Sequence, residues 1–385
     1  MYRNLLKLNT MKKLTSLHKG IKLAALALVS LTIHQSSFAQ GDVAQLLKAG
    51  AADASKLVQA YTTPFFRGFG AGLNGGWYNT AKPHGLGRFD VTFNMNLCTV
   101  PTEDQTYDAA ALGFTAIRLD NPANHIGQTL AGEINPKNNP VYVLELDNTA
   151  TPVPGDKIEV ARFDAPPGAG LPYSGAPTVQ LAVGLIKKTE VMVRYMPTVS
   201  LGKQGDIGLV GFGLKHDIKQ WIPVVSKMPF DMSAYFGYTK MNLNYGLDLK
   251  PEAGVPNKTG NNGVYADQAM DLETKSTTFG LILSKKLAIL TVYGAANYQR
   301  SSTTLGLNGD YPITSFEGTV GDPNFGSKVV DKVSNPVNFT VDGANGMTGT
   351  LGARLKLLVL TFQGAYTFGK YPMVTAGVGL NIDWK

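Results

Sequence analysis

The sequence is poor in cysteine and in charge. Cys98 is the only cysteine among 385 residues, which excludes an intrachain disulfide and any zinc or iron–sulfur site built on cysteines. Charged residues make up 16%, against about 25% in an ordinary soluble domain. Glycine (43), tyrosine (16) and phenylalanine (17) are plentiful, and a chain with so little charge and so many aromatics is not intrinsically disordered.

The formal net charge of the whole chain is +7, but most of it comes from the first 39 residues. Residues 1–39 contain six basic residues and no acidic one, so 29 basic residues (35 minus 6) face 28 acidic residues in the remainder. A net charge of about +1 gives no reason to expect a nucleic-acid partner.

Residues 1–39 have the pattern of an export signal. A lysine-rich start precedes the apolar run Ile21–Ile33, and Ser37-Phe38-Ala39 fits cleavage before Gln40. Met11 is the expected natural start. The apolar run is shorter than the ~20 residues of a spanning helix, and no later run is longer. We therefore expect an exported protein with no transmembrane helix.

The first mature segment, residues 40–64, is predicted to be an amphipathic helix that ends at Pro64. Apolar residues recur at helical spacing, among them Val43, Leu46, Leu47, Leu57 and Val58. This stripe must be buried, either as a plug in a lumen or against a rim or partner.

From Phe65 onward apolar and polar residues alternate, which predicts an all-β domain over residues 65–385. The expected strands are 65–78, 86–98, 109–119, 178–187, 189–199, 206–216, 229–245, 273–285, 288–300, 346–357, 358–368 and 371–385. Further hairpins in 120–177 and 301–346 would raise the number from about 12 to 14.

Strand and turn lengths indicate a transmembrane antiparallel β-barrel. The runs match the ~9–11 residues of a tilted membrane strand and exceed the ~5–6 residues of a globular one. Short turns alternate with long loops, as in outer-membrane barrels. We therefore expect an outer-membrane location in a Gram-negative bacterium, with membrane lipid and the barrel assembly machinery as partners.

The polar parity of these strands is expected to face the lumen. It carries Arg88, Asp90, Asn94, Asn96, Glu190, Arg194, Arg354, Asn381 and Asp383. These side chains could line an aqueous path or fill a narrow barrel as an internal salt-bridge network.

No catalytic or metal site is predicted. The mature histidines His84, His125 and His216 show no metal-ligand spacing, and no cofactor is expected. An acyl hydrolase would need a nucleophile beside a histidine, for which Ser174 with His125 is the nearest candidate.

The segments Gly70–Lys82 with Arg88-Phe89-Asp90, and Leu214–Pro223 with Pro229-Phe230-Asp231, resemble a family of uncharacterised exported β-barrel proteins from the Bacteroidota. In architecture the chain is also similar to long-chain fatty-acid outer-membrane transporters, which combine an N-terminal plug with a barrel. This resemblance implies an exported barrel and brings no established activity.

The favoured function is a passive channel or transporter for small hydrophobic or amphipathic molecules, which would be its ligands. A structural or assembly barrel for surface or secretion machinery is the first alternative, and an outer-membrane acyl hydrolase is the second.

Overall fold

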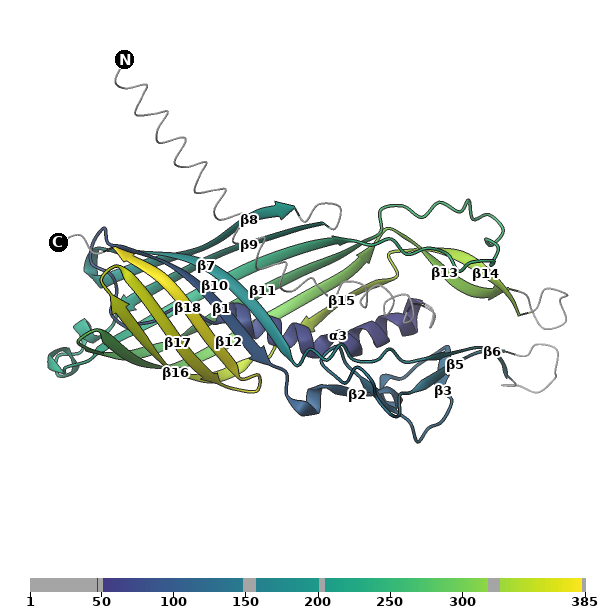
Figure 1. Cartoon of the computed structure of the whole chain (residues 1–385), viewed down its shortest axis with the longest axis horizontal. Coiled ribbons are helices and arrows are strands. Elements are labelled where there is room, and N and C mark those ends of the chain that lie inside the picture. Colours follow the sequence, from purple (N-terminus) through teal and green to yellow (C-terminus); the bar gives the residue numbers. More distant parts are fainter. Residues whose placement is uncertain (1–46, 48–50, 148–156, 201–204, 318–325, 383–385) are drawn as a thin grey trace, which may run out of the picture.

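The computed structural model describes residue 47 and residues 51–147, 157–200, 205–317 and 326–382. The expected signal, Val43, Leu46 and Asp383 lie outside these residues. The described part is mostly β, with one long helix near its N-terminal end (Figure 1). That helix is α3, Ala51–Asn74.

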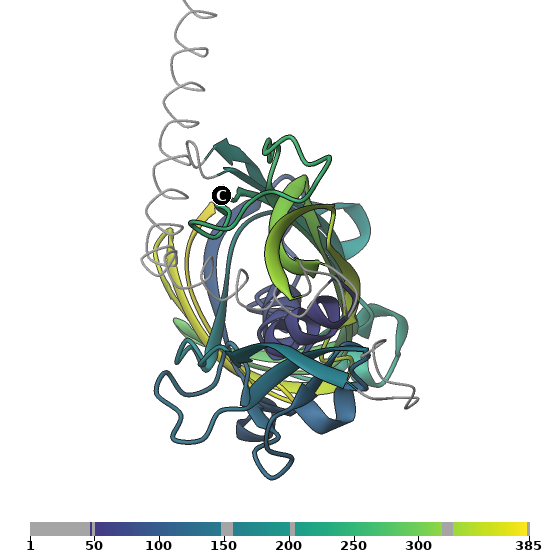
Figure 2. The same ribbon diagram turned by 90° about the vertical axis from the view of Figure 1, so that its right-hand side faces the viewer.

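Ten strands form a closed antiparallel ring, because β18 pairs with β1 and β11 pairs with β12. In order around the ring they are β1 (Phe89–Thr99), β7 (Tyr173–Leu185), β8 (Thr189–Ser200), β9 (Gly205–Asp217), β10 (Asp231–Gly246), β11 (Ala269–Leu287), β12 (Leu290–Asn308), β16 (Gly346–Leu357), β17 (Leu360–Phe368) and β18 (Met373–Ile382). Closure leaves every strand with two neighbours (Figure 2).

An eleventh strand of the sheet, β15 (Val337–Asp342), extends β16 along the same side of β12. Gln299 of β12 pairs with Gly346, and Ser302 pairs with Asp342. Residues 343–345 shift the register by one between the two pairings, as in a β-bulge. The predicted barrel is therefore confirmed in outline, but its ring holds ten strands and not 12 or 14.

The strand predicted at 65–78 is wrong, because α3 continues through Pro64 to Asn74. Close packing explains the helix. A Cβ at Gly70 would lie 2.4 Å from Ser301 Oγ, and a Cβ at Gly72 would lie 2.8 Å from the Cβ of Ala176. Side chains at these positions would clash with the wall, so the glycines allow the helix to pack closely against it.

The strand predicted at 109–119 is also wrong as a barrel strand. It contains the short helix η2 (Ala109–Leu112) and β3 (Ile117–Leu119), which lies in a small sheet outside the ring. Of the extra strands considered in 120–177 and 301–346, β15 joins the main sheet and the others pair in small sheets outside the ring. These sheets are β2 (Thr106–Asp108) with β4 (Ile126–Gln128), β3 with β5 (Val141–Asp147) and β6 (Lys157–Asp164), and β13 (Asp310–Glu317) with β14 (Ser327–Ser334).

The two ends of the ring differ. At one end, called the short-turn end, compact connections join β7 to β8, β9 to β10, β11 to β12 and β16 to β17. They include η3 (Ile186–Lys188), η5 (Lys219–Trp221) and η6 (Val225–Lys227). At the long-loop end, the small sheets and η1 (Thr102–Asp104) form a cap beyond the strands (Figure 1).

The ring is polar inside and apolar outside. On β7, Gln180 is buried and Leu181 is exposed; on β8, Arg194 is buried and Val193 is exposed. The same alternation places Thr278 inside and Phe279 outside. A water-soluble sheet would bury its apolar face, so this polarity is the reverse of a globular core.

Helix α3 lies inside the ring. Its Leu57, Val58 and Tyr61 are buried in an apolar cluster that also contains inward residues of the strands and residues of the cap. No described helix is both long enough and apolar enough to cross a membrane.

Candidate functional site

The lumen is occupied by residues 51–88, here called the lumen segment, which comprises α3 and the irregular chain that follows it (Figure 2). At its start, Asp53 contacts residues 115–117 of the cap. Near its end, His84 contacts Glu190 beside the β7–β8 turn. The segment therefore runs through the ring from the long-loop end to the short-turn end.

Arg194 anchors the C-terminal end of α3. Its guanidinium donates to the carbonyl oxygens of Leu73 at 2.7 Å and Gly75 at 2.6 Å, and to Gln180 Oε1 at 3.1 Å. It also lies 3.7 Å from the ring centroid of Trp77. A cation at the C-terminus of a helix interacts favourably with the negative end of the helix dipole. It also satisfies carbonyl groups that have no helical partner.

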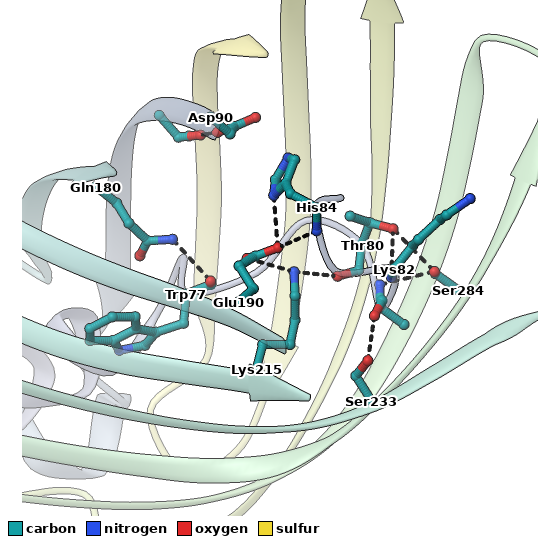
Figure 3. Close-up of polar contacts among 12 residues, drawn as sticks. Trp77, Thr80, Lys82, His84, Asp90, Gln180, Glu190, Lys215, Ser233 and Ser284 are labelled. Atoms are coloured by element: carbon teal, nitrogen blue, oxygen red, sulfur yellow. Dashed lines mark hydrogen bonds and ion pairs between the residues drawn. The ribbon is translucent and has the colours of Figure 1, made fainter. Parts of the chain in front are cut away.

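A charged cluster holds the end of the lumen segment (Figure 3). Lys215 Nζ lies 2.9 Å from Glu190 Oε1, and both side chains are 2% exposed. Glu190 Oε2 accepts from the backbone N–H of His84 at 2.9 Å and lies 2.7 Å from His84 Nδ1. Lys215 also donates to the carbonyl of Thr80 at 3.3 Å. The two charges on the wall are thus satisfied by each other and by the segment.

Polar side chains of β1 and β18 also hold the segment, and Arg354 of β16 pairs with one of them. Asn94 donates to the carbonyl of Gly76 at 3.1 Å. Asn381 Nδ2 lies 2.7 Å from His84 Nε2 and 3.3 Å from Asp90 Oδ2, and Arg354 pairs with Asp90 at 3.2 Å. These contacts come from β1, β16 and β18, so the segment is bonded on several sides.

Asp53 fixes the start of α3 to the cap. Its carboxylate accepts from the backbone N–H groups of Thr115, Ala116 and Ile117 and from the Thr115 hydroxyl. Burial raises the pKa of Asp53, but these donors outweigh burial, so its pKa lies below the ordinary value. The carboxylate is therefore held charged.

Most residues predicted to line the lumen point into it. Asp90, Asn94, Asn96, Glu190, Arg194, Arg354 and Asn381 are all buried on strands of the ring. Arg88 differs, because it is exposed at the short-turn end before β1. In the predicted helix, Leu47, Leu57 and Val58 are buried in the apolar cluster.

The sequence analysis missed Lys215, Trp77 and Asp53. Lys215 could have been found, because it shares the inward parity of the predicted strand 206–216. Trp77 and Asp53 lie in the lumen segment, and no local sequence pattern predicts how that segment runs through the barrel.

Little free space remains inside. Two cavities border the lumen segment: one of about 20 Å3 near Asn297 and Thr350, and one of about 10 Å3 near Glu190 and Thr92. Such volumes hold only one or two water molecules. At these two places the lumen segment and the wall therefore leave room for little more than water.

The hydrolase candidates are not assembled. Ser174 is fully buried in β7 against the lumen segment, whereas His125 is a half-buried residue of the cap paired with Asp108 at 2.8 Å. No hydrogen bond joins Ser174 to His125. Among the described residues no group of three His, Cys, Asp or Glu side chains could hold a metal ion.

A closed antiparallel ring with an apolar exterior and a polar, self-filled interior is the architecture of an outer-membrane β-barrel. The chain belongs to a family of unknown function, DUF6588, whose model matches residues 11–382. No curated protein matches it.

Two solved structures are similar in part. The translocator domain of the autotransporter NalP from Neisseria meningitidis is 9% identical, with a TM-score of 0.28, over 84% of this chain and 96% of that one. The outer-membrane transporter YddB from Escherichia coli is 8% identical, with a TM-score of 0.25, over 77% of this chain and 41% of that one.

Proposed function

We propose that this protein is an outer-membrane barrel shut by its own N-terminal segment, which anchors a folded cap at the cell surface. It belongs to the non-transporting class of barrels. The observation that carries the proposal is the set of buried polar bonds between the lumen segment and the wall, centred on Arg194, Glu190 and Lys215.

The apolar exterior supports a membrane location. Exposed leucine, valine and phenylalanine side chains cover the outward parity of the strands, which is costly in water and favourable in lipid. Ring closure satisfies the backbone groups that hydrocarbon would leave unpaired.

Energetics favour a permanent seal over an open channel. If the lumen segment left, Arg194 would lose both carbonyl acceptors, and Glu190 would lose the N–H of His84. Departure would exchange these fixed bonds for bonds to water entering the lumen, a net loss of about 0.5–1.5 kcal/mol per hydrogen bond and more where a charged group takes part. Departure would also expose the apolar stripe of α3.

The orientation follows from the loops. Outer-membrane barrels keep short turns in the periplasm and long loops outside. The cap then faces the outside, and α3 enters the barrel from the same side. The described start of α3 then lies at the cell-surface end, and the C-terminal strand ends at the periplasmic side.

Planar-bilayer recording tests the seal. We expect the intact protein to give no steady conductance, and a variant lacking residues 42–74 to conduct if it inserts. An open, ohmic pore in the intact protein would contradict the proposal. Heat-modifiable migration of each preparation on gels serves as the check that the barrel has formed.

A gated transporter of small hydrophobic or amphipathic molecules is the second candidate. Towards the long-loop end some inward side chains are apolar, with Leu209, Met241, Leu272 and Leu305 in the same cluster as α3. Displacement of α3 would open an apolar chamber there. Uptake of a fluorescent fatty acid into liposomes would support this candidate, provided that covalent attachment of α3 to the wall abolishes it.

A further inference from the structure

The short-turn end is basic in a way that the seal does not explain. Its turns and the strand ends beside them, residues 185–189, 218–230, 285–290 and 356–360, contain seven lysines and no acidic residue. By contrast, residues 100–147 of the cap contain seven acidic and two basic residues. Positive charge is therefore concentrated at one end of the barrel.

Four of these lysines are available to a ligand. Lys187, Lys227, Lys285 and Lys286 are exposed, and within the described ranges none of them forms an ion pair. Lys188, by contrast, forms an ion pair with Asp217, with 3.2 Å between Nζ and Oδ2. The free ammonium groups come from three separate connections, so they are spread around the rim.

The backbone indicates that turn geometry does not dictate lysine at these places. Lys187 and Lys188 have φ values of 53° and 51°, in the left-handed region that glycine and asparagine occupy more easily. Three residues, Ile186–Lys188, connect the paired residues Leu185 and Thr189, and left-handed positions in such turns favour glycine, asparagine or aspartate. The β7–β8 turn nevertheless carries two consecutive cations.

Apolar side chains project among the lysines. Leu358 is 92% exposed, Val224 72%, Trp221 67% and Ile186 65%. Lysine interleaved with aliphatic and indole groups suits the boundary of a bilayer, where apolar atoms reach the acyl chains and ammonium groups reach the phosphates. Trp221 is held in place, since its Nε1 donates to His216 Nε2 at 2.9 Å.

We propose that this rim, defined by Lys187, Lys227, Lys285, Lys286 and Trp221, binds the headgroups of anionic phospholipids in the leaflet that it meets. The inference rests on the proposed membrane location. Charge complementarity selects the occupant, because a zwitterionic headgroup offers the lysines no net charge while phosphatidylglycerol does. The binding would fix the depth of the barrel at its periplasmic face.

Tryptophan quenching tests the proposal with the full chain in phosphatidylcholine vesicles. Trp384→Phe is the parent, because Trp77 is buried in the lumen and Trp221 then reports on the rim. Brominated phosphatidylglycerol should quench Trp221 with at least about threefold higher relative affinity than brominated phosphatidylcholine. Replacing Lys187, Lys227, Lys285 and Lys286 by Gln should remove this preference, and so should high salt.

A matched control replaces Lys137, Lys250, Lys258 and Lys328 of the opposite end by Gln, and it should keep the preference. Equal quenching by the two lipids in the parent, or a preference that survives in the rim variant, would overturn the inference. Quenching by neither lipid would instead show that the ring lies outside a bilayer, and the proposed function itself would fail.

Discussion

The guanidinium of Arg194 lies over the ring of Trp77 while it donates to two carbonyl oxygens at the end of α3. Arg194 belongs to the wall and Trp77 to the lumen segment, so one side chain joins the barrel to its seal. The contact is fully buried, and solvent does not screen it.

Replacing Arg194 by Met should loosen the seal. The carbonyl groups of Leu73 and Gly75 would lose their donor, and unsatisfied buried acceptors cost about 1–3 kcal/mol each. We expect the free energy of unfolding in urea to fall by about 2–4 kcal/mol and transient conductance to appear in bilayers. Arg88→Met, at the exposed mouth, is the matched control. An Arg194→Met protein that is as stable as the control and shows no more conductance would contradict the anchoring role.

The Glu190–Lys215 pair should show strong coupling in a double-mutant cycle. Both side chains are 2% exposed, so removing one partner leaves a buried charge, which costs about 3–5 kcal/mol. We expect Glu190→Gln to be more destabilising than Glu190→Gln combined with Lys215→Met. The exposed pair Lys240–Glu273, 33% and 36% exposed, is the comparison and should couple by less than about 1 kcal/mol. Similar coupling energies in the two pairs would contradict the claim that the Glu190–Lys215 pair is shielded from water.

Asp53 should make the start of α3 sensitive to acid. Its pKa is lowered in the folded protein, so its contribution is complete above the ordinary carboxyl pKa and is lost as pH falls through the folded value. Asp53→Asn should therefore reduce hydrogen-exchange protection of residues 51–60 at pH 7 by about tenfold or more. It should change protection little once the wild-type carboxylate is itself protonated. Equal protection at pH 7 would exclude the role.

An epitope inserted between residues 41 and 42 should be labelled on intact cells. The chain enters the barrel from the long-loop end, so we expect an antibody to reach this site without permeabilisation. A tag in the exposed loop near Gly254 is the positive control, and one at Ala288 should need permeabilisation. If the tag before residue 42 behaved like the one at Ala288, the direction of threading would be wrong.

Alternation in the strands could be read from the sequence because the ring repeats one local rule, polar inside and apolar outside. That rule placed Arg194 and Glu190 correctly on the inward parity. It failed for residues 65–74, which are helical and where Gly68, Gly70 and Gly72 allow close contacts with β7 and β12. Those partners are more than 100 residues away, so no local pattern reports them.

The path of the lumen segment was likewise beyond local analysis. The sequence predicted a buried helix and left open whether it plugs the lumen or docks on a rim. Its position depends on bonds such as Asn74 to the carbonyl of Arg300 and Ser276 to that of Gly70, which form only once the ring closes.

A disulfide between α3 and the wall tests the threaded lumen most directly. A Cβ added at Gly68 would lie 3.7 Å from the Cβ of Cys98 on β1, within the ~3.5–4.5 Å of natural disulfides. Cys98 is the only native cysteine, so Gly68→Cys creates a single pair, and Gln59→Cys, at an exposed position of α3 about 13 Å away along the helix, is the control. After mild oxidation of native membranes, we predict a crosslink between residues 68 and 98 in the Gly68→Cys protein and none in the control. A Gly68→Cys thiol that stays free and reacts fully with maleimide in the assembled barrel would contradict a helix inside the ring.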